Sequence, residues 1–229
     1  MTAEKTKLAE HTTPSKERQF KGIPLSERKR IRREKLIEAG IQCYGTQGFF
    51  AVTVKDICAE AKLTERYFYE SFKKSEALFH SIFEQLIQRL QVTIGTAILT
   101  ANKDPLAMID AGLNALLTTI KQDPRIARII YIDAMLVKEL HKQATLHEAM
   151  GRFDDMIFQV ITALFPEKTL ANANTSLVAT GLNGYVTQVA IRWVTNGFKE
   201  PIQEVLVSCR VVFLSLICLL EQQQQVNHA

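Results

Sequence analysis

The residues best suited to chemistry lie in the segment from Thr53 to Tyr67, where their groups match those of duplex DNA. The guanidinium of Arg66 can donate two hydrogen bonds to the O6 and N7 atoms of a guanine in the major groove. Glu65 beside it can accept from a cytosine amine, or can instead stabilise the N-terminal end of a helix. The hydroxyls of Thr53 and Thr64 suit phosphate oxygens, which fix the register of a protein on DNA. We therefore expect base readout by Arg66 and Tyr67, with Glu65 as a further candidate.

Two short helices joined by a tight turn must position these residues. The spacing of Thr53 and Asp56 is that of a capping box and predicts a helix over residues 53–61. Residues 62–63 form the turn, and a third helix follows over residues 64–72. Such a helix-turn-helix inserts its second helix into the major groove. Helices this short gain their stability by packing together, and their expected shared core is Phe49, Val54, Ile57, Ala61, Leu63, Phe68 and Phe72.

A basic helix precedes this pair. Ser26 is a suitable N-cap, apolar residues then recur at helical spacing, and the helix is expected to stop at Gly45 and Gly48. Tyr67 has a second interpretation, as a half-buried aromatic that supports this helix instead of reading a base. Four cations along the helix either contact phosphate or the minor groove, or are simply solvated: Lys29, Arg30, Arg32 and Arg33.

Positive charge is concentrated at the N-terminal end of the chain. Residues 1–35 carry eleven Lys or Arg against five Asp or Glu, whereas residues 81–229 carry twelve against thirteen. This asymmetry is typical of a polyanion-binding segment attached to a nearly neutral body. Residues 1–24 lack an apolar period, so we expect a flexible basic arm before a helix-turn-helix domain over residues 25–73.

The rest of the chain, residues 74–229, is expected to form a second helical domain. Apolar residues recur there at spacings of three and four, and no alternating strand pattern occurs in the sequence. The chain is therefore predicted to be all-α, with about nine helices. Helices are expected from Lys74, from Asp104 and Asp123 (each followed by proline), over residues 135–165 up to Pro166, over about 172–196, and from Glu200 onward.

Composition restricts the class of protein. The 229 residues are 47% apolar, which is ample for a buried core and excludes a collagen-like or mainly disordered chain. The four cysteines are too scattered for a disulfide framework, and no CxxC, GxSxG, HExxH, P-loop or GxGxxG motif occurs. We therefore expect no enzymatic activity, no metal site and no cofactor. The apolar run 205–220 is short for a membrane span and contains Arg210, which predicts a buried helix.

About fifty contiguous residues resemble the TetR family of one-component transcriptional regulators. The motif residues are Leu36, Ile37, Ala39, Gly48, Phe49, Thr53, Val54, Ile57, Leu63, Thr64, Phe68, Tyr69, Phe72, Glu76 and Leu78. The sequence departs from the family pattern at Lys62, where glycine is usual, at Arg66, where a small residue is common, and at Ser75, where lysine is common. Lys62 predicts a slightly altered turn, because glycine adopts positive φ far more cheaply than lysine. Lys73 and Lys74 lie beside Ser75 and can supply the missing charge.

The resemblance implies three further sites. It places the Tyr69 hydroxyl and Lys73 or Lys74 against the DNA backbone. It implies a ligand pocket in the second domain. The candidate wall residues, each of which could instead be plain core, are Phe83, Leu86, Met108, Leu116, Tyr131, Met135, Phe158 and Trp193. The candidates for polar ligand contacts are Tyr131, Asn183, Tyr185 and Trp193. It also implies that the last two helices form a homodimer interface, with candidate residues Gly184, Val205, Cys209, Val212, Leu216 and Leu219.

Together these expectations describe a cytoplasmic homodimer that binds a palindromic double-stranded DNA operator and no membrane. By resemblance it is a repressor, released when a small, largely apolar or aromatic effector shifts a two-state equilibrium through the helix that follows Lys74. A ligand-independent or activating regulator is the alternative. A membrane-surface or protein-interaction helical module is a more remote one.

Overall fold

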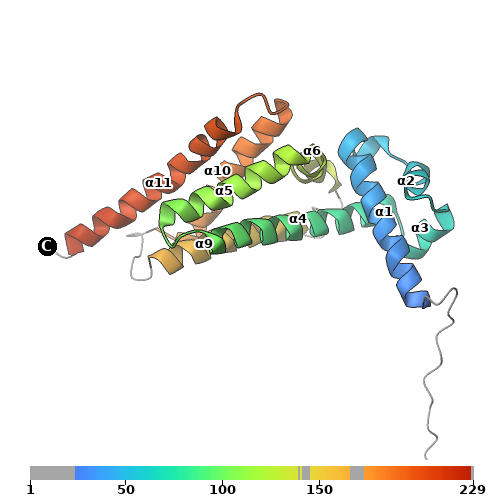
Figure 1. Cartoon of the computed structure of the whole chain (residues 1–229), viewed down its shortest axis with the longest axis horizontal. Coiled ribbons are helices and arrows are strands. Elements are labelled where there is room, and N and C mark those ends of the chain that lie inside the picture. The colour runs from blue at the N-terminus through green and yellow to red at the C-terminus, as the bar shows by residue number, and fades with distance from the viewer. Residues whose placement is uncertain (1–23, 139, 141–144, 166–172, 228–229) are drawn as a thin grey trace, which may run out of the picture.

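The computed structural model describes residues 24–138, 140, 145–165 and 173–227, and these residues form helices and turns with no strand. Three helices form a head at one end, and the long helix α4 leads from it into a helical body (Figure 1). The predicted flexible arm, apart from Pro24, and the predicted helix end at Pro166 lie outside the described residues. The elements are α1 (Leu25–Gln47), η1 (Phe49–Ala51), α2 (Val54–Ala61), α3 (Glu65–Ser71), α4 (Ser75–Thr100), α5 (Pro105–Gln122), α6 (Pro124–Arg128), η2 (Ile129–Asp133), α7 (Ala134–Leu136), α9 (Thr145–Leu164), α10 (Thr175–Thr195) and α11 (Ile202–Asn227).

The prediction of an all-α chain with about nine helices is confirmed. α6, the π-helical turn η2 and α7 follow one another without leaving helical backbone, so they form one continuous rod. Counted in this way, the elements named above make nine helical rods besides the short 3₁₀ turn η1, and Lys138 and Leu140 are helical outside them.

The prediction of one helix over residues 135–165 is wrong. The rod that begins at Pro124 continues to Leu136, the backbone at Val137 is extended (φ −80°, ψ 98°), and α9 begins at Thr145. The two rods pack in different places, because α6 and η2 lie against α1 whereas α9 lies along α10 and α4. One straight helix cannot make both sets of contacts. Apolar residues continue at helical spacing on both sides of the break, so periodicity conceals it.

Local capping sets where two of the helices begin. The Thr53 hydroxyl accepts a hydrogen bond from the backbone N–H of Asp56, and the Asp56 carboxylate accepts from the backbone N–H of Thr53 in return (2.9 Å). The hydrogen bonds from Thr53 hold the pKa of the Asp56 carboxyl below its usual value. Asp104 caps α5 by accepting from Ala107 N at 2.8 Å, with Pro105 at the first helical position.

The head is held by a core that α1, α2, α3 and the start of α4 share. Tyr44 of α1 is fully buried there, with its ring centroid 5.3 Å from Phe49 and 5.6 Å from Phe79. All seven predicted core residues pack in this core. Four are buried (Ile57, Ala61, Phe68 and Phe72) and three are partly buried against them (Phe49, Val54 and Leu63).

The body continues from the head without a gap in its core. α4 packs along α5, α9 packs along α10, and α11 packs against α5 and α10. One connected cluster of buried apolar side chains extends from Leu36 in the head, through Phe83 of α4, to Trp193 and Cys209 in the last two helices. Close-packed side chains therefore connect the head with most of the body, and a second, smaller cluster contains Ile161, Leu182, Leu216 and Leu220.

Candidate DNA-binding surface and effector cavity

Helix α3 is anchored on one side and exposed on the other. Phe68 and Phe72 insert into the head core, whereas Glu65, Arg66 and Tyr69 lie exposed. The side chain of Arg66 is 83% exposed, and Tyr69 is 58% exposed. An anchored helix with an exposed polar ridge is the arrangement that entry into a major groove requires.

Tyr67 lies between α3 and α1, half-buried, as its second interpretation describes. The Arg32 guanidinium stacks over its ring, 4.2 Å from the ring centroid. Glu70 holds this arrangement from the next turn, because its carboxylate lies 3.7 Å from Arg32 and 3.1 Å from Arg66. Glu70 therefore connects the exposed ridge of α3 with the stacked pair beneath it.

The cations on α1 have separate positions that the sequence did not distinguish. Arg33 donates to the backbone carbonyl of Ser71 (3.2 Å) and lies over the Phe72 ring (4.2 Å), so it fastens α3 to α1. Arg30 pairs with Glu27 and Glu34 on its own helix. Lys29 is exposed. Arg32 and Arg33 thus position the recognition helix, a role that neither of their two predicted alternatives contained.

The predicted backbone-contacting residues lie exposed around α2 and α3. Thr64 is the N-cap residue of α3, and its side chain makes no capping hydrogen bond. Thr53 is the N-cap of α2, and its hydroxyl also donates to the Asp56 carboxylate at 2.6 Å. Lys73 and Lys74 lie on the turn before α4. In this conformation the Thr64 hydroxyl, which makes no capping hydrogen bond, is more available than the Thr53 hydroxyl.

The turn between α2 and α3 keeps the backbone conformation that usually requires glycine. Lys62 caps α2 with φ 55° and ψ 43°, in the left-handed region, and its N–H donates to Ala59 O at 3.2 Å. The lysine therefore occupies a left-handed conformation, at a cost of about 1 kcal/mol relative to glycine.

The head is joined to the body by a set of contacts from α6 that the sequence did not reveal. Arg125 donates to the Gln42 side chain at 2.6 Å, and Arg128 donates to the Gln47 carbonyl at 3.2 Å. Gly45 permits this approach, because a Cβ there would overlap the Arg125 Cβ and lie 2.9 Å from its Cα. The first helix was predicted to stop at Gly45 and Gly48. It continues through Gly45 to Gln47, and Gly48 is its C-cap residue. A glycine inside an otherwise regular helix was the available signal of close packing.

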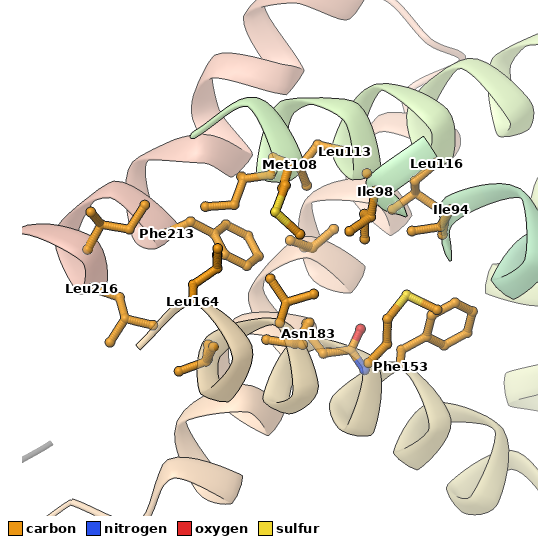
Figure 2. Close-up of a pocket in the computed structure, with 18 of the residues that line it drawn as sticks. Ile94, Ile98, Met108, Leu113, Leu116, Phe153, Leu164, Asn183, Phe213 and Leu216 are labelled. Atoms are coloured by element: carbon orange, nitrogen blue, oxygen red, sulfur yellow. The ribbon is translucent and has the colours of Figure 1, made fainter. Parts of the chain in front are cut away.

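An apolar cavity of about 110 Å³ lies in the body, between α4, α5, α9, α10 and α11 (Figure 2). Ile98, Met108, Phe153 and Phe213 are among the side chains that line it, and Asn183 supplies a polar group at its edge. Apolar cavities of roughly this size stay dry and admit a benzene-sized molecule. The site is therefore suited to an apolar ligand or to the apolar part of a larger one.

The ten predicted pocket residues fall into three groups. Met108, Leu116 and Asn183 line the cavity, and Tyr131 lines a smaller cavity of about 30 Å³ that adjoins it. Phe83, Leu86 and Trp193 are buried in close-packed core instead. Met135, Phe158 and Tyr185 lie exposed at the surface. Helical spacing identifies the buried face of a helix, but it does not show where opposing faces leave space between them.

The stripe predicted for the dimer interface packs mainly inside the protomer. Val205, Cys209 and Leu216 are buried against the body, and Val212 is partly buried. Burial also raises the pKa of the Cys209 thiol to about 11. Because α11 is apolar almost all round, its sequence cannot show which stripe turns inward. The exposed apolar surface, here named the α10–α11 face, consists of Leu177, Gly184, Tyr185, Val207, Val211 and Leu219.

Within α11, the segment Ile202–Leu220 has the length and apolar composition of a membrane-crossing helix. It packs here against α5 and α10, and Arg210 near its middle forms an ion pair with Asp110 of α5 at 2.7 Å. A long apolar helix of a protein core meets the same criteria of length and composition, so these alone do not indicate a membrane.

Comparison with known proteins supports the assignment of the head. Residues 36–82 match the family described as bacterial regulatory proteins, tetR family. The nucleoid occlusion factor SlmA of Idiomarina loihiensis is 23% identical over 177 residues, which cover 77% of this chain and 90% of that protein.

Two of the similar solved structures share the fold over about four fifths of this chain. The fatty acid degradation regulator FadR from Bacillus halodurans has a TM-score of 0.70 at 16% identity, covering 80% of this chain and 94% of that one. FadR from Bacillus subtilis, solved in complex with stearoyl-CoA, has a TM-score of 0.67 at 15% identity, covering 82% and 97%. The family match falls on the helices that present Arg66 and Tyr69, so the head of this chain is similar to the DNA-binding segment of tetR-family regulators.

Proposed function

We propose that the chain is a homodimeric, cytoplasmic repressor that binds a palindromic operator through α3 and leaves it when a small, largely apolar or aromatic effector enters the body. The observation that carries the proposal is the pairing of an anchored, exposed α3 with an apolar cavity in the same close-packed molecule. The FadR structure from Bacillus subtilis, whose ligand carries a long acyl chain, supports an apolar occupant for this cavity.

On the DNA side, Arg66 reads a guanine, and Thr64, Tyr69, Lys73 and Lys74 contact the backbone. The Arg66 guanidinium exchanges its exposed pairing with Glu70 for two acceptors on one base, an exchange that costs little because exposed ion pairs contribute little. Glu65, next to it, either accepts a hydrogen bond from a cytosine amine or only stabilises the N-terminal end of α3.

Fluorescence anisotropy with DNA fragments from the region upstream of the gene tests this surface. Arg66→Ala should weaken binding by about 1–3 kcal/mol and relax preference at one base pair per half-site. Lys73→Ala should weaken binding to all sequences alike and lower the salt dependence by about one unit of slope. Arg89→Ala removes an exposed arginine from α4 and is the matched control. A uniform loss across sequences in Arg66→Ala would make Arg66 a backbone contact instead.

Dimerisation is proposed through the α10–α11 face. Leu177, Val207, Val211 and Leu219 are each more than half exposed in the protomer, a clustering that is uncommon on a free surface. Gly184 and the ring of Tyr185 lie between them and allow close helix approach. A two-fold axis through this face would place two heads on one side of the assembly, as a palindromic operator requires.

Release by effector is proposed to act through α4 and the α6 contacts together. α4 lines the cavity with Ile94 and Ile98 near its C-terminal end and packs into the head with Leu78 and Phe79 at the other. Operator affinity measured with and without saturating effector tests the switch. Unchanged affinity would favour the ligand-independent alternative, and tighter binding would favour an activating or co-repressed regulator.

A further inference from the structure

The chemistry of the effector can be narrowed from the polar groups of the cavity. Asn183 of α10 is the one polar side chain among the described residues that line the larger, 110 Å³ chamber. It also lines the smaller chamber, together with Tyr131 and Thr187, and the two chambers share the walls formed by Leu116 and Phe153. Asn183 thus lies where an apolar space meets a polar one.

Two acceptors determine which way the Asn183 amide points. Its Nδ2 donates to Asp154 Oδ1 at 2.7 Å and to the Met150 carbonyl at 3.3 Å, both on α9. A carboxylate oxygen and a backbone carbonyl accept only, so the amide nitrogen must face them. Thr180 donates to the second Asp154 oxygen at 2.7 Å and holds the carboxylate in place. Figure 2 shows the result, with the nitrogen turned toward α9 and the oxygen toward the cavity.

The Asn183 oxygen is therefore an acceptor without a donor among the described residues. Both hydrogens of the amide are used by α9, so the cavity receives only the acceptor half of the group. An acceptor that faces an apolar space gains a hydrogen-bond partner when a ligand brings a donor to it. This favours ligands that bring a hydroxyl or N–H to this point.

The smaller chamber provides a second, neutral contact. The Tyr131 ring is buried, and burial raises the pKa of its phenol, which stays protonated and able to donate at neutral pH. About 30 Å³ accommodates one or two polar heavy atoms, the size of a hydroxyl or a primary amide, and not a larger head group.

The described lining of the two chambers offers no counterion to an anionic head group. No Lys, Arg or His lines either chamber within the described part of the chain. Arg210, one turn from Phe213, is already paired with Asp110 at 2.7 Å. The Asp154 carboxylate lies directly behind Asn183 and would repel a second negative charge. A carboxylate or phosphate placed here would lose its hydration and gain no counterion.

We propose that the effector is an uncharged molecule with an apolar body in the larger chamber and one hydroxyl or primary-amide end, which donates to Asn183 Oδ1 and meets the Tyr131 hydroxyl. The inference rests on the proposed function, because it names the ligand class of the same cavity. The proposed ligand class distinguishes this site from a site that binds a fatty acid through its carboxylate.

Isothermal titration of the full chain without DNA tests the proposal with three probes of equal chain length: 1-octanol, octanamide and octanoate. At pH 7.5 the alcohol and the amide should bind at least about tenfold more tightly than the carboxylate. Asn183→Leu should remove most of this preference. Tyr131→Phe, which keeps the ring and its packing, should weaken octanamide about three- to tenfold, whereas Tyr185→Phe on the surface should leave it unchanged.

The proposal is overturned if octanoate binds as tightly as the neutral probes, if none of the three binds, or if both cavity variants leave the affinities unchanged. Operator binding, measured separately, distinguishes this failure from that of the switch. If octanamide binds and the DNA affinity does not change, the ligand class stands and the switch fails. If octanoate alone releases DNA, the switch stands and the ligand class fails.

Discussion

The carboxylate of Asp133 accepts a hydrogen bond from the backbone N–H of Phe49, with 3.2 Å between Oδ2 and N. Asp133 ends the π-helical turn that carries Tyr131 at the smaller chamber, and Phe49 begins the link between α1 and α2. Arg128 approaches the same carboxylate at 3.8 Å. One buried acceptor therefore connects a wall of the cavity directly with the helix-turn-helix, alongside the longer route through α4.

Asp133→Asn tests the ionisation of this group. Burial raises the pKa of Asp133 above the usual 3.8, although the Phe49 N–H and Arg128 oppose the shift. A raised pKa means that the carboxyl contributes most stability below its ordinary pKa and loses it as pH rises through the folded-state value. Asparagine can still accept from Phe49 but does not titrate. Between pH 4 and neutrality, urea denaturation should therefore show the variant gaining in free energy of unfolding relative to wild type. If the difference in free energy of unfolding between the variant and wild type does not change with pH, or changes in the opposite direction, the prediction is contradicted.

Gly45→Ala tests the contact between α1 and α6. Alanine normally stabilises a helix interior by about 1 kcal/mol relative to glycine. Here the new methyl group overlaps Arg125, so we expect a net loss of about 1–3 kcal/mol and a weakened attachment of α6 to the head. Gly151→Ala, where nothing lies within 4 Å of the added Cβ, should instead stabilise by about 0.5–1 kcal/mol. Chemical denaturation of both variants measures the sign of the change in free energy of unfolding. Stabilisation by Gly45→Ala would show that α6 does not pack against α1 as described.

Lys62→Gly should stabilise the head. The wild-type lysine holds φ 55°, which glycine adopts without steric cost. The free energy of unfolding should therefore rise by up to about 1 kcal/mol. The greater entropy that glycine gives the unfolded chain reduces this gain. Lys55→Gly, in the first turn of α2, removes the same charge from a position with ordinary helical backbone and should destabilise by up to about 1 kcal/mol. Thermal melts of the two variants compare them directly, and equal destabilisation would contradict the left-handed turn.

Val211→Glu should separate the proposed dimer. Val211 is 53% exposed at the centre of the α10–α11 face, so glutamate is tolerated by the protomer but places two like charges near a two-fold axis. Light scattering on a sizing column should show half the wild-type mass at low micromolar concentration. Val92→Glu, at a valine 62% exposed on α4, should leave the mass unchanged. A dimeric Val211→Glu protein, or a monomeric wild type, rules out this interface.

Features that depend on local sequence were predictable here. The capping box of Thr53 and Asp56, the Asp104-Pro105 start of α5 and the small core around Phe68 and Phe72 all follow from spacing within a few residues. These signals arise from interactions inside one turn or between adjacent helices, so one sequence contains them in full.

Features that depend on tertiary packing were not predictable. The break at Val137 lies within continuous helical periodicity, and the inward-facing stripe of α11 is chosen by α5 and by the pairing of Arg210 with Asp110. Arg32 on Tyr67 joins residues 35 positions apart. Such contacts leave no periodic trace in the sequence, because either partner alone is also compatible with a solvated surface.

The length of α4 sets the amplitude of any movement that begins at its far end. Its 26 residues span about 39 Å, so a tilt of about 5° at the cavity carries the head sideways by roughly 3 Å. In a symmetric pair the two displacements add, which alters the separation of the recognition helices by an appreciable fraction of a major-groove width of about 12 Å. If the proposed switch acts through this helix, α4 works as a lever, and a small tilt at the cavity is enough to misalign both heads.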